Sequence, residues 1–125
     1  MDNIQETKLE NFDREAKFIF RFLVDKYGYK LLSVNKNSNS VYHYYLNEKE
    51  NLKIEISNAP YYTDYGFTFF IYNLDNDEYL IACNIPHENQ DNNSDFIINA
   101  CNIIFSNDSY EKVINGKLWI KQNSL

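Results

Sequence analysis

The sequence of 125 residues has no lysine or arginine between residues 54 and 111. That stretch holds ten of the 18 acidic residues and the densest run of aromatic residues, whereas all 12 basic residues lie outside it. The net charge is −6. Because such a surface repels phosphate groups, nucleic-acid binding is disfavoured. The same charge attracts a cationic partner and speeds its encounter with the protein.

The sequence also lacks a long apolar run. Its most apolar window, residues 18–24, is interrupted by Arg21 and is far too short to span a bilayer. Residues 1–6 carry neither a basic region nor an apolar run, so no signal peptide is predicted. We therefore expect a cytoplasmic protein that does not bind membranes and whose two cysteines are reduced thiols.

Glycine is scarce, and the three glycines are far apart in the sequence: Gly28, Gly66 and Gly116. A phosphate-binding loop or a dinucleotide fingerprint needs several glycines at short spacing. Neither motif can be built from these residues. The common nucleotide-binding sites are thereby excluded.

Cysteine and histidine are equally scarce, with two of each: Cys83, Cys101, His43 and His87. A zinc site needs four such ligands in paired spacing, and these four residues are not paired. A thiolate pair of Cys83 with His87 is disfavoured because Pro86 turns the chain between them. Cys101 falls on the apolar stripe of a predicted helix, where a packed core thiol is the favoured interpretation.

Oxygen-rich segments do not complete a metal site either. Residues 91–95 place oxygen ligands at three positions of a calcium loop, but Phe96 replaces the required glycine and Asn102 replaces the closing glutamate. No serine lies in a nucleophile motif, and no two carboxylates have the spacing of an acid–base pair. We therefore expect no metal, no cofactor and no catalytic residue, and hence a protein that is not an enzyme.

The length predicts a single domain, residues 1–125. Apolar residues recur at helical spacing over residues 9–27, which predicts a helix there. Thr7 and Glu10 have the spacing of a capping box, and Gly28 is placed as a C-terminal helix glycine.

Two aromatic residues of this helix, Phe18 and Phe22, fall off the main apolar stripe and form a second ridge. The favoured interpretation is that neighbouring chain covers them. The alternative is a partner-binding surface on the helix.

Five segments then have the character of strands: residues 29–34, 41–46, 52–57, 67–74 and 79–84. The third alternates apolar and polar residues, as a half-buried antiparallel strand does. The fourth is apolar at successive positions, so we place it centrally in the sheet. Because the connections are too short for helical crossovers, the sheet is predicted to be an antiparallel meander.

The C-terminal part is predicted to be mainly helical. A second helix is predicted with Ser94 or Asp95 as its N-terminal cap. A further helical turn covers residues 109–115, and a short closing strand covers residues 117–121. The predicted fold class is therefore α+β. It consists of an N-terminal helix, an antiparallel meander of about five strands, a C-terminal helix and a short closing strand, with the helices on one face of the sheet.

Candidate partner-binding residues lie mainly in the turns of the acidic, aromatic stretch. The loop 58–66 joins two predicted strands and is rich in tyrosine, a residue enriched in interface hot spots. In the alternative interpretation these tyrosines cover the end of the sheet. The predicted partner-binding residues are Tyr61, Tyr62, Asp64, Tyr65, Asp75, Asp77, Glu78, Glu88, Asp91 and Trp119.

Residues 12–29 read FDREAKFIFRFLVDKYGY and end in a Phe-Leu-x-x-x-Tyr-Gly-Tyr pattern that leads directly into the predicted meander. In this opening, and in its size, element order and charge, the chain resembles immunity proteins that bacteria encode beside polymorphic or contact-dependent toxins. The resemblance implies a cytoplasmic protein that binds and blocks a cognate toxin, often a basic nuclease. We expect it to act as a monomer or weak dimer.

Two alternatives remain from the sequence. A secretion chaperone has a similar size, acidity and order of elements, but chaperones of that kind are usually dimers. A small enzyme or ligand-binding domain would place its pocket between the sheet and the first helix. A bound small molecule, or a carboxylate of raised pKa in a closed cavity, would favour this second alternative.

Overall fold

The computed structural model describes residues 7–59, 66–90 and 94–120. The helices are α1 (Lys8–Ile19), α2 (Phe22–Asp25), α3 (Asp95–Phe105) and α4 (Asp108–Ile114), with a 3-10 turn at His87–Asn89. The strands are β1 (Lys30–Lys36), β2 (Val41–Asn47), β3 (Leu52–Ala59), β4 (Gly66–Asn73) and β5 (Glu78–Ile85). The predicted α+β class and all five predicted strands are confirmed.

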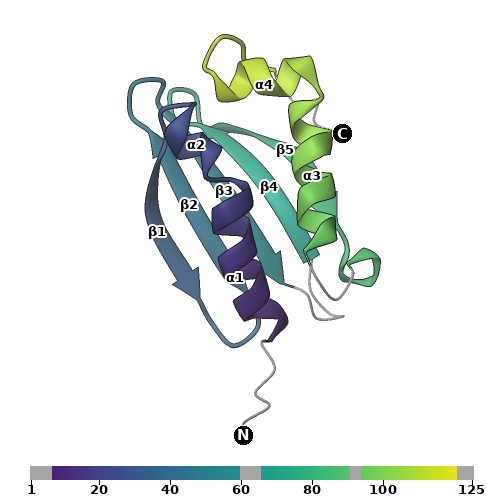
Figure 1. Ribbon diagram of the computed structural model, residues 1–125. Helices are drawn as coiled ribbons and strands as arrows, with labels where there is room; N and C mark the ends of the chain where they lie inside the picture. Colours follow the sequence, from purple (N-terminus) through teal and green to yellow (C-terminus); the bar gives the residue numbers. More distant parts are fainter. Residues whose placement is uncertain (1–6, 60–65, 91–93, 121–125) are drawn as a thin grey trace, which may run out of the picture.

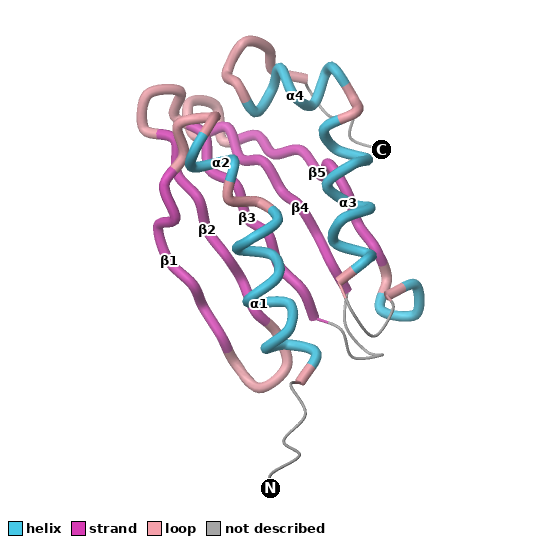
Figure 2. Tube along the Cα trace, in the orientation of Figure 1, coloured by secondary structure: helices cyan, strands magenta, loops and turns pink. Residues whose placement is uncertain are grey.

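The five strands form one antiparallel sheet in the order β1-β2-β3-β4-β5, which is the predicted meander (Figure 1). The helices lie on one face of the sheet, with α1 and α3 running along it side by side (Figure 2). Strand β4 is an inner strand, as predicted. Because β3 pairs with β4 without a register shift, side chains of the two strands form regular rows across the sheet.

The N-terminal helix begins as predicted but ends early. The Thr7 hydroxyl accepts a hydrogen bond from the Glu10 backbone, and the Glu10 carboxylate accepts one from the Thr7 backbone. The single helix predicted over residues 9–27 is in fact α1 followed by the short α2. At the break the Arg21 guanidinium donates to the Phe18 carbonyl oxygen at 2.7 Å, and the turn allows both Phe20 and Leu23 to be fully buried.

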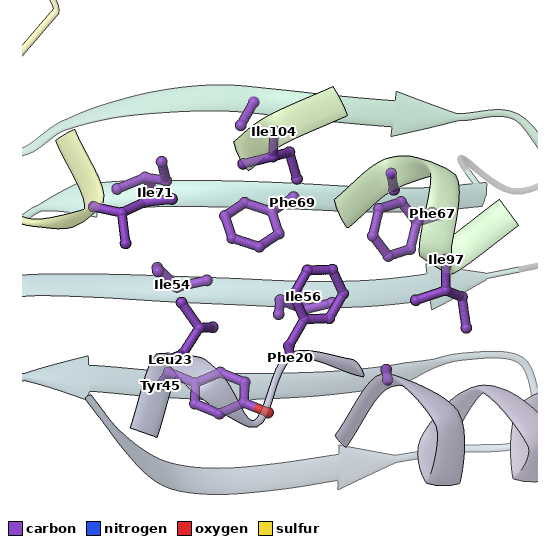
Figure 3. Close-up of a cluster of buried hydrophobic side chains, with 14 of the residues drawn as sticks. Phe20, Leu23, Tyr45, Ile54, Ile56, Phe67, Phe69, Ile71, Ile97 and Ile104 are labelled. Atoms are coloured by element: carbon purple, nitrogen blue, oxygen red, sulfur yellow. The ribbon is translucent and has the colours of Figure 1, made fainter. Parts of the chain in front are cut away.

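The core fills the space between the helices and the inward face of the sheet (Figure 3). Phe20 of the α1–α2 turn packs against Phe69 with ring centroids 5.5 Å apart, and Phe12 packs against Phe67 at 6.1 Å. Ala16 of α1 is also fully buried. The pocket that the enzyme hypothesis placed between the sheet and the first helix is therefore occupied by core side chains.

The C-terminal part contains the two predicted helical segments but not the predicted strand. Ser94 precedes α3 without a side-chain capping bond, and the Asn107 side chain caps α4. Residues 117–120 have no regular secondary structure, so the closing strand predicted for 117–121 is wrong over its described part. The Tyr29 hydroxyl donates to the Ile114 carbonyl oxygen at 2.9 Å and ties α4 to the chain beyond α2.

Gly66, at the start of β4, offers a test of this packing. Its φ is +81°. A β-carbon at this position would overlap the Ile85 carbonyl oxygen and would lie 2.9 Å from backbone atoms of Pro86 and His87. Gly28 has a similar φ of +83°, but a β-carbon there would meet only the Asn47 side chain, at 3.7 Å. We expect Gly28→Ala to lower the free energy of unfolding by about 1–2 kcal/mol from backbone strain alone. Gly66→Ala should lower the free energy of unfolding by about 2 kcal/mol more than Gly28→Ala does, because backbone atoms near the new β-carbon must move.

Urea unfolding of the two glycine variants and the parent measures this difference. Equal losses at the two positions would show that the close approach of β4 to the end of β5 is not a tight constraint.

Candidate functional site

The face of the sheet opposite the helices is the strongest candidate for a functional site. No helix among the described residues lies on it (Figure 1). We call it the open face. Alternation along the strands and the pairing register place on it Tyr42, Tyr44, Lys53, Glu55, Ser57, Thr68, Phe70, Tyr72, Tyr79, Ile81 and Asn84.

The open face is unusually aromatic. Tyr42 and Tyr44 of β2 stack with ring centroids 6.3 Å apart and an interplanar angle of 6°. On the other side of β3, Phe70 stacks on Tyr72 at 5.7 Å, and Tyr79 lies against both rings at 5.9 and 6.1 Å. Tyr79 is 52% exposed. Solvent-facing strand positions are ordinarily polar, so this group of rings is a candidate interaction surface.

A hollow of about 580 Å³ lies in this face. The described residues that line it include Tyr42, Glu55, Ser57, Phe70 and Tyr72. We call it the open-face hollow. Its volume falls within the range of sites that bind small molecules.

Glu55 lies at the centre of the aromatic residues. The register places it opposite Tyr44 on β2 and opposite Phe70 on β4. The Tyr72 hydroxyl donates a long hydrogen bond of 3.5 Å to the carboxylate. Burial raises the pKa of Glu55, against the opposing effects of this hydrogen bond and of the Lys53 charge. The carboxylate is thus partly removed from water without a strong partner among the described residues.

The predicted site residues of the β4–β5 turn contact other parts of the chain. The Asp75 carboxylate accepts a hydrogen bond from Asn51 at 2.6 Å, and Asp77 is exposed with a φ of 58°. The Trp119 indole donates to the Glu78 carboxylate at 2.7 Å. Trp119, which was predicted to be a partner-binding residue on a strand, is therefore half-buried and fastens the C-terminal segment to the end of the sheet.

The predicted acidic turns do not gather at one end of the fold. Glu88 follows β5, whereas the β4–β5 turn precedes it, so the two sites are separated by a strand of eight residues, or about 25 Å. The remaining predicted site residues lie outside the described residues: Tyr61, Tyr62, Asp64, Tyr65 and Asp91.

Residues 54–111, which contain no lysine or arginine, are spread over one side of the molecule and do not form a single compact patch. They comprise most of β3, all of β4 and β5, and α3, whereas Lys30 and Lys36 lie on β1 at the opposite edge of the sheet. The positive charges of β1 therefore lie at one edge of the sheet, and the acidic turns that border β5, with Asp75, Asp77 and Glu88, lie at the other.

The two residues of the predicted second aromatic ridge, Phe18 on α1 and Phe22 on α2, have different environments. Phe22 is half-buried against Phe105 of α3 and Tyr27, with ring centroids 4.7 and 5.9 Å away. Phe18 is 61% exposed, and the Arg21 guanidinium covers its ring at 4.0 Å. Neighbouring chain thus covers Phe22 but leaves much of Phe18 in solvent.

A buried histidine on the helix-covered face was not predicted as a functional residue. His43 has no exposed side-chain area, stacks on Phe12, and donates from Nε2 to the Asp13 carboxylate at 2.8 Å. Lys36 and Lys17 contact the same carboxylate at 2.8 and 3.3 Å. With Nε2 protonated, the Nδ1 lone pair has no hydrogen-bond partner among the described residues. The cluster joins α1 to β1 and β2.

The His43 cluster is suited to holding the helix on the sheet rather than to catalysis. Burial lowers the pKa of His43, although the Asp13 carboxylate opposes this change. Burial raises the pKa of Asp13, but hydrogen bonds from Lys36, His43 and Lys17 outweigh it and hold that pKa at about 2. The favoured state is therefore a neutral imidazole beside an ionised carboxylate.

The cysteines show no activated chemistry in the described residues. Cys83 on β5 and Cys101 on α3 are unpaired and half-buried, and burial raises the pKa of each thiol. Raised values disfavour the nucleophilic thiolate at neutral pH. Within the described ranges, no three His, Cys, Asp or Glu side chains cluster as metal ligands would.

Comparison of the sequence with protein-family models and curated proteins, and of the structure with solved structures, finds no match. None of the helices in the described ranges has the length and apolar character needed to cross a membrane.

Sequence reasoning missed most of the open face. A signal was available in β2, where Val41, His43 and Tyr45 alternate with Tyr42 and Tyr44. Two outward tyrosines at this spacing indicate a second aromatic surface. Glu55 lies among aromatic rings from three strands because of the register in which the strands pair. The sequence alone does not specify this register.

The His43 cluster leads to a pH-dependent prediction. The folded-state pKa of His43 is below its ordinary 6.5, so the unfolded chain binds more protons once the pH falls below about 6.5, and stability decreases. Asp13, whose pKa of about 2 lies below its ordinary 3.8, loses its contribution only in more acidic solution. We expect His43→Gln to reduce the slope of unfolding free energy against pH between pH 7 and pH 5.5. One proton accounts for a slope of at most about 1.4 kcal/mol per pH unit.

The measurement is urea unfolding of parent and variant at several pH values in this interval. Both proteins keep the Asp13, Lys17 and Lys36 side chains that face the imidazole, so the difference between the two slopes reports His43. The same slope in both proteins would contradict a neutral buried His43.

Proposed function

We propose that this chain is a cytoplasmic binding protein without catalytic activity that neutralises a cognate bacterial toxin by covering it with the open face. The observation that carries the proposal is the cluster of aromatic rings on a sheet face that no described helix covers. Tyrosine and phenylalanine at such a position supply contact area at low cost in side-chain entropy.

The dimensions of the open face support a protein partner. Five strands with a spacing of about 4.8 Å and a length of seven or eight residues give a face of about 600 Å². A stable complex buries about 800 Å² on each partner. The open face together with its bordering turns therefore has the area that a specific complex needs.

Charge supports a cationic partner. Strands β4 and β5 carry no lysine or arginine, and the carboxylates of Asp75, Asp77, Glu78 and Glu88 lie at their ends. Long-range attraction between these carboxylates and a basic surface raises the rate of association more than it changes the lifetime of the complex.

The resemblance to immunity proteins makes a toxin the proposed partner. An inhibitor of this kind needs no catalytic residues, since occlusion of the toxin's active site is sufficient. A secretion chaperone is the alternative with the same surface chemistry, and a dimer in solution would favour it.

A ligand-binding domain is a second candidate function, and the open-face hollow is the observation that favours it. Its volume of about 580 Å³ suits a small molecule. The site lies on the face opposite to the one expected from the sequence. A small molecule retained by the purified protein would favour this candidate.

Two exposed aromatic residues on opposite faces test the proposal. Tyr79 on the open face is 52% exposed and Phe18 on α1 is 61% exposed, so removing either ring should have little effect on stability. We expect Tyr79→Ala to weaken binding to the toxin encoded by the neighbouring gene about 10- to 100-fold, since interface aromatics contribute about 1.4–2.8 kcal/mol or more. Phe18→Ala should bind as the parent does.

Calorimetry or surface-based kinetics with the purified neighbouring gene product measures both variants. Unchanged affinity of Tyr79→Ala would remove the open face from the interface. A loss confined to Phe18→Ala would place the partner on the helix-covered side instead.

Charge variants test the electrostatic part separately. Glu88 is exposed next to the end of β5, and Lys49 is exposed in the β2–β3 turn. We expect Glu88→Lys to slow association a few-fold and Lys49→Glu to speed it, with dissociation rates nearly unchanged. Stopped-flow association at low and high salt gives the rates. The difference between the variants should shrink at high salt, and rates that do not depend on these charges would contradict a cationic partner.

A further inference from the structure

We infer that the open-face hollow is a binding site for a guanidinium group, with the Glu55 carboxylate as its anion and the surrounding aromatic rings as its walls. The occupant is an arginine side chain of the protein partner, so the inference rests on the proposed function and specifies its central contact.

The position of Glu55 supports an ionic contact at the middle of the face. Among the described residues that line the hollow, Glu55 is the one acidic residue, and none is a lysine or arginine. The carboxylate has one long hydrogen bond, 3.5 Å from the Tyr72 hydroxyl, and no ion-pair partner among the described residues. Its remaining lone pairs are available to a donor that enters the hollow.

The walls of the hollow suit a planar cation. Tyr42 stands on one side of β3, and Phe70 and Tyr72 stand on the other. Aromatic faces attract cations through their ring quadrupole, and a guanidinium group also stacks on them as a flat surface. A carboxylate between such rings offers the two oxygens that a guanidinium fork recognises.

The open face already holds one cation in this manner. The Lys53 ammonium lies 4.7 Å from the centroid of the Tyr44 ring, next to the hollow but not lining it. Lys53 and Glu55 are on the same face of β3 and yet form no ion pair. The lysine lies on the tyrosine and acts on the carboxylate through its charge without contacting it, so the Glu55 oxygens remain open to an external cation.

The energetics favour a charged occupant over water or an apolar group. Burial raises the pKa of Glu55, which means that the ionised carboxylate is incompletely solvated in the free protein. An apolar group in the hollow would increase this cost. A guanidinium group replaces the missing solvation with charge-assisted hydrogen bonds and remains charged at any physiological pH.

The test uses a small probe and the full chain. N-acetyl-arginine amide is titrated into the protein, with N-acetyl-citrulline amide, its uncharged analogue of nearly the same shape, as the matched ligand. Chemical shifts of the backbone amides of β2, β3 and β4 report the site. We expect the arginine probe to bind at the open face at least about tenfold more tightly than the citrulline probe.

Two protein variants complete the test. Glu55→Gln keeps the shape of the side chain and should reduce affinity for the arginine probe to that of the citrulline probe. Glu88→Gln removes a carboxylate outside the hollow and should leave the preference for arginine intact. Equal binding of the two probes to the parent, or an unchanged preference in Glu55→Gln, would overturn the inference.

Binding of the toxin to the same variants separates this inference from the proposed function. Toxin affinity that falls in both Tyr79→Ala and Glu55→Gln supports both. A loss in Tyr79→Ala alone overturns the arginine contact and leaves the open face as the interface. In a third outcome, the arginine probe binds through Glu55, but both variants bind the toxin as tightly as the parent does. The hollow would then bind a cation, but the open face would not be the toxin interface and no toxin arginine would occupy the hollow.

Discussion

The rest of the structure depends on the burial of one face of the sheet beneath α1. Phe12, Ala16 and Phe20 have no exposed area, and they pack on the inward side chains of the central strands. Since side chains of a strand alternate, fixing one set inward fixes the other set outward. A slip of β3 by one residue would exchange Ile54 with Glu55 and bury an unpaired carboxylate in the core. The outward position of Glu55 is thus a consequence of core packing.

Much of this architecture was predictable because the strands are marked by alternation and bounded by polar turns. The break between α1 and α2 was not predictable, since apolar spacing continues through it and the break depends on the packing of Phe20 and Leu23 on the sheet. The segment around Trp119 has strand-forming residues, but a strand needs a partner as well as propensity. Trp119 instead bonds to the Glu78 side chain across 41 positions of sequence, a contact that no local pattern contains.

The sequence predicts which residue types the candidate site contains, acidic and aromatic, but it does not predict where in the fold they lie. Its stretch without lysine or arginine forms one side of the fold, but adjacent strands run in opposite directions, so its acidic turns lie at opposite ends of the sheet. Tyr42, Phe70 and Tyr79 come from three different strands. They lie on the same face of the sheet only because of the register in which the strands pair. Similarly, Asp13 and His43 meet only because α1 crosses β2.

An aromatic face of a sheet that no other layer covers favours association with a second molecule of the same protein. Net charge of −6 opposes such pairing, because two copies repel each other before their faces meet. The same charge leaves a basic partner free to approach. Lys53 on the Tyr44 ring further limits the apolar area presented by the free protein. The arrangement therefore discriminates by charge: the aromatic rings supply contact area for any occupant, while the half-buried carboxylate at their centre favours one that brings a cation.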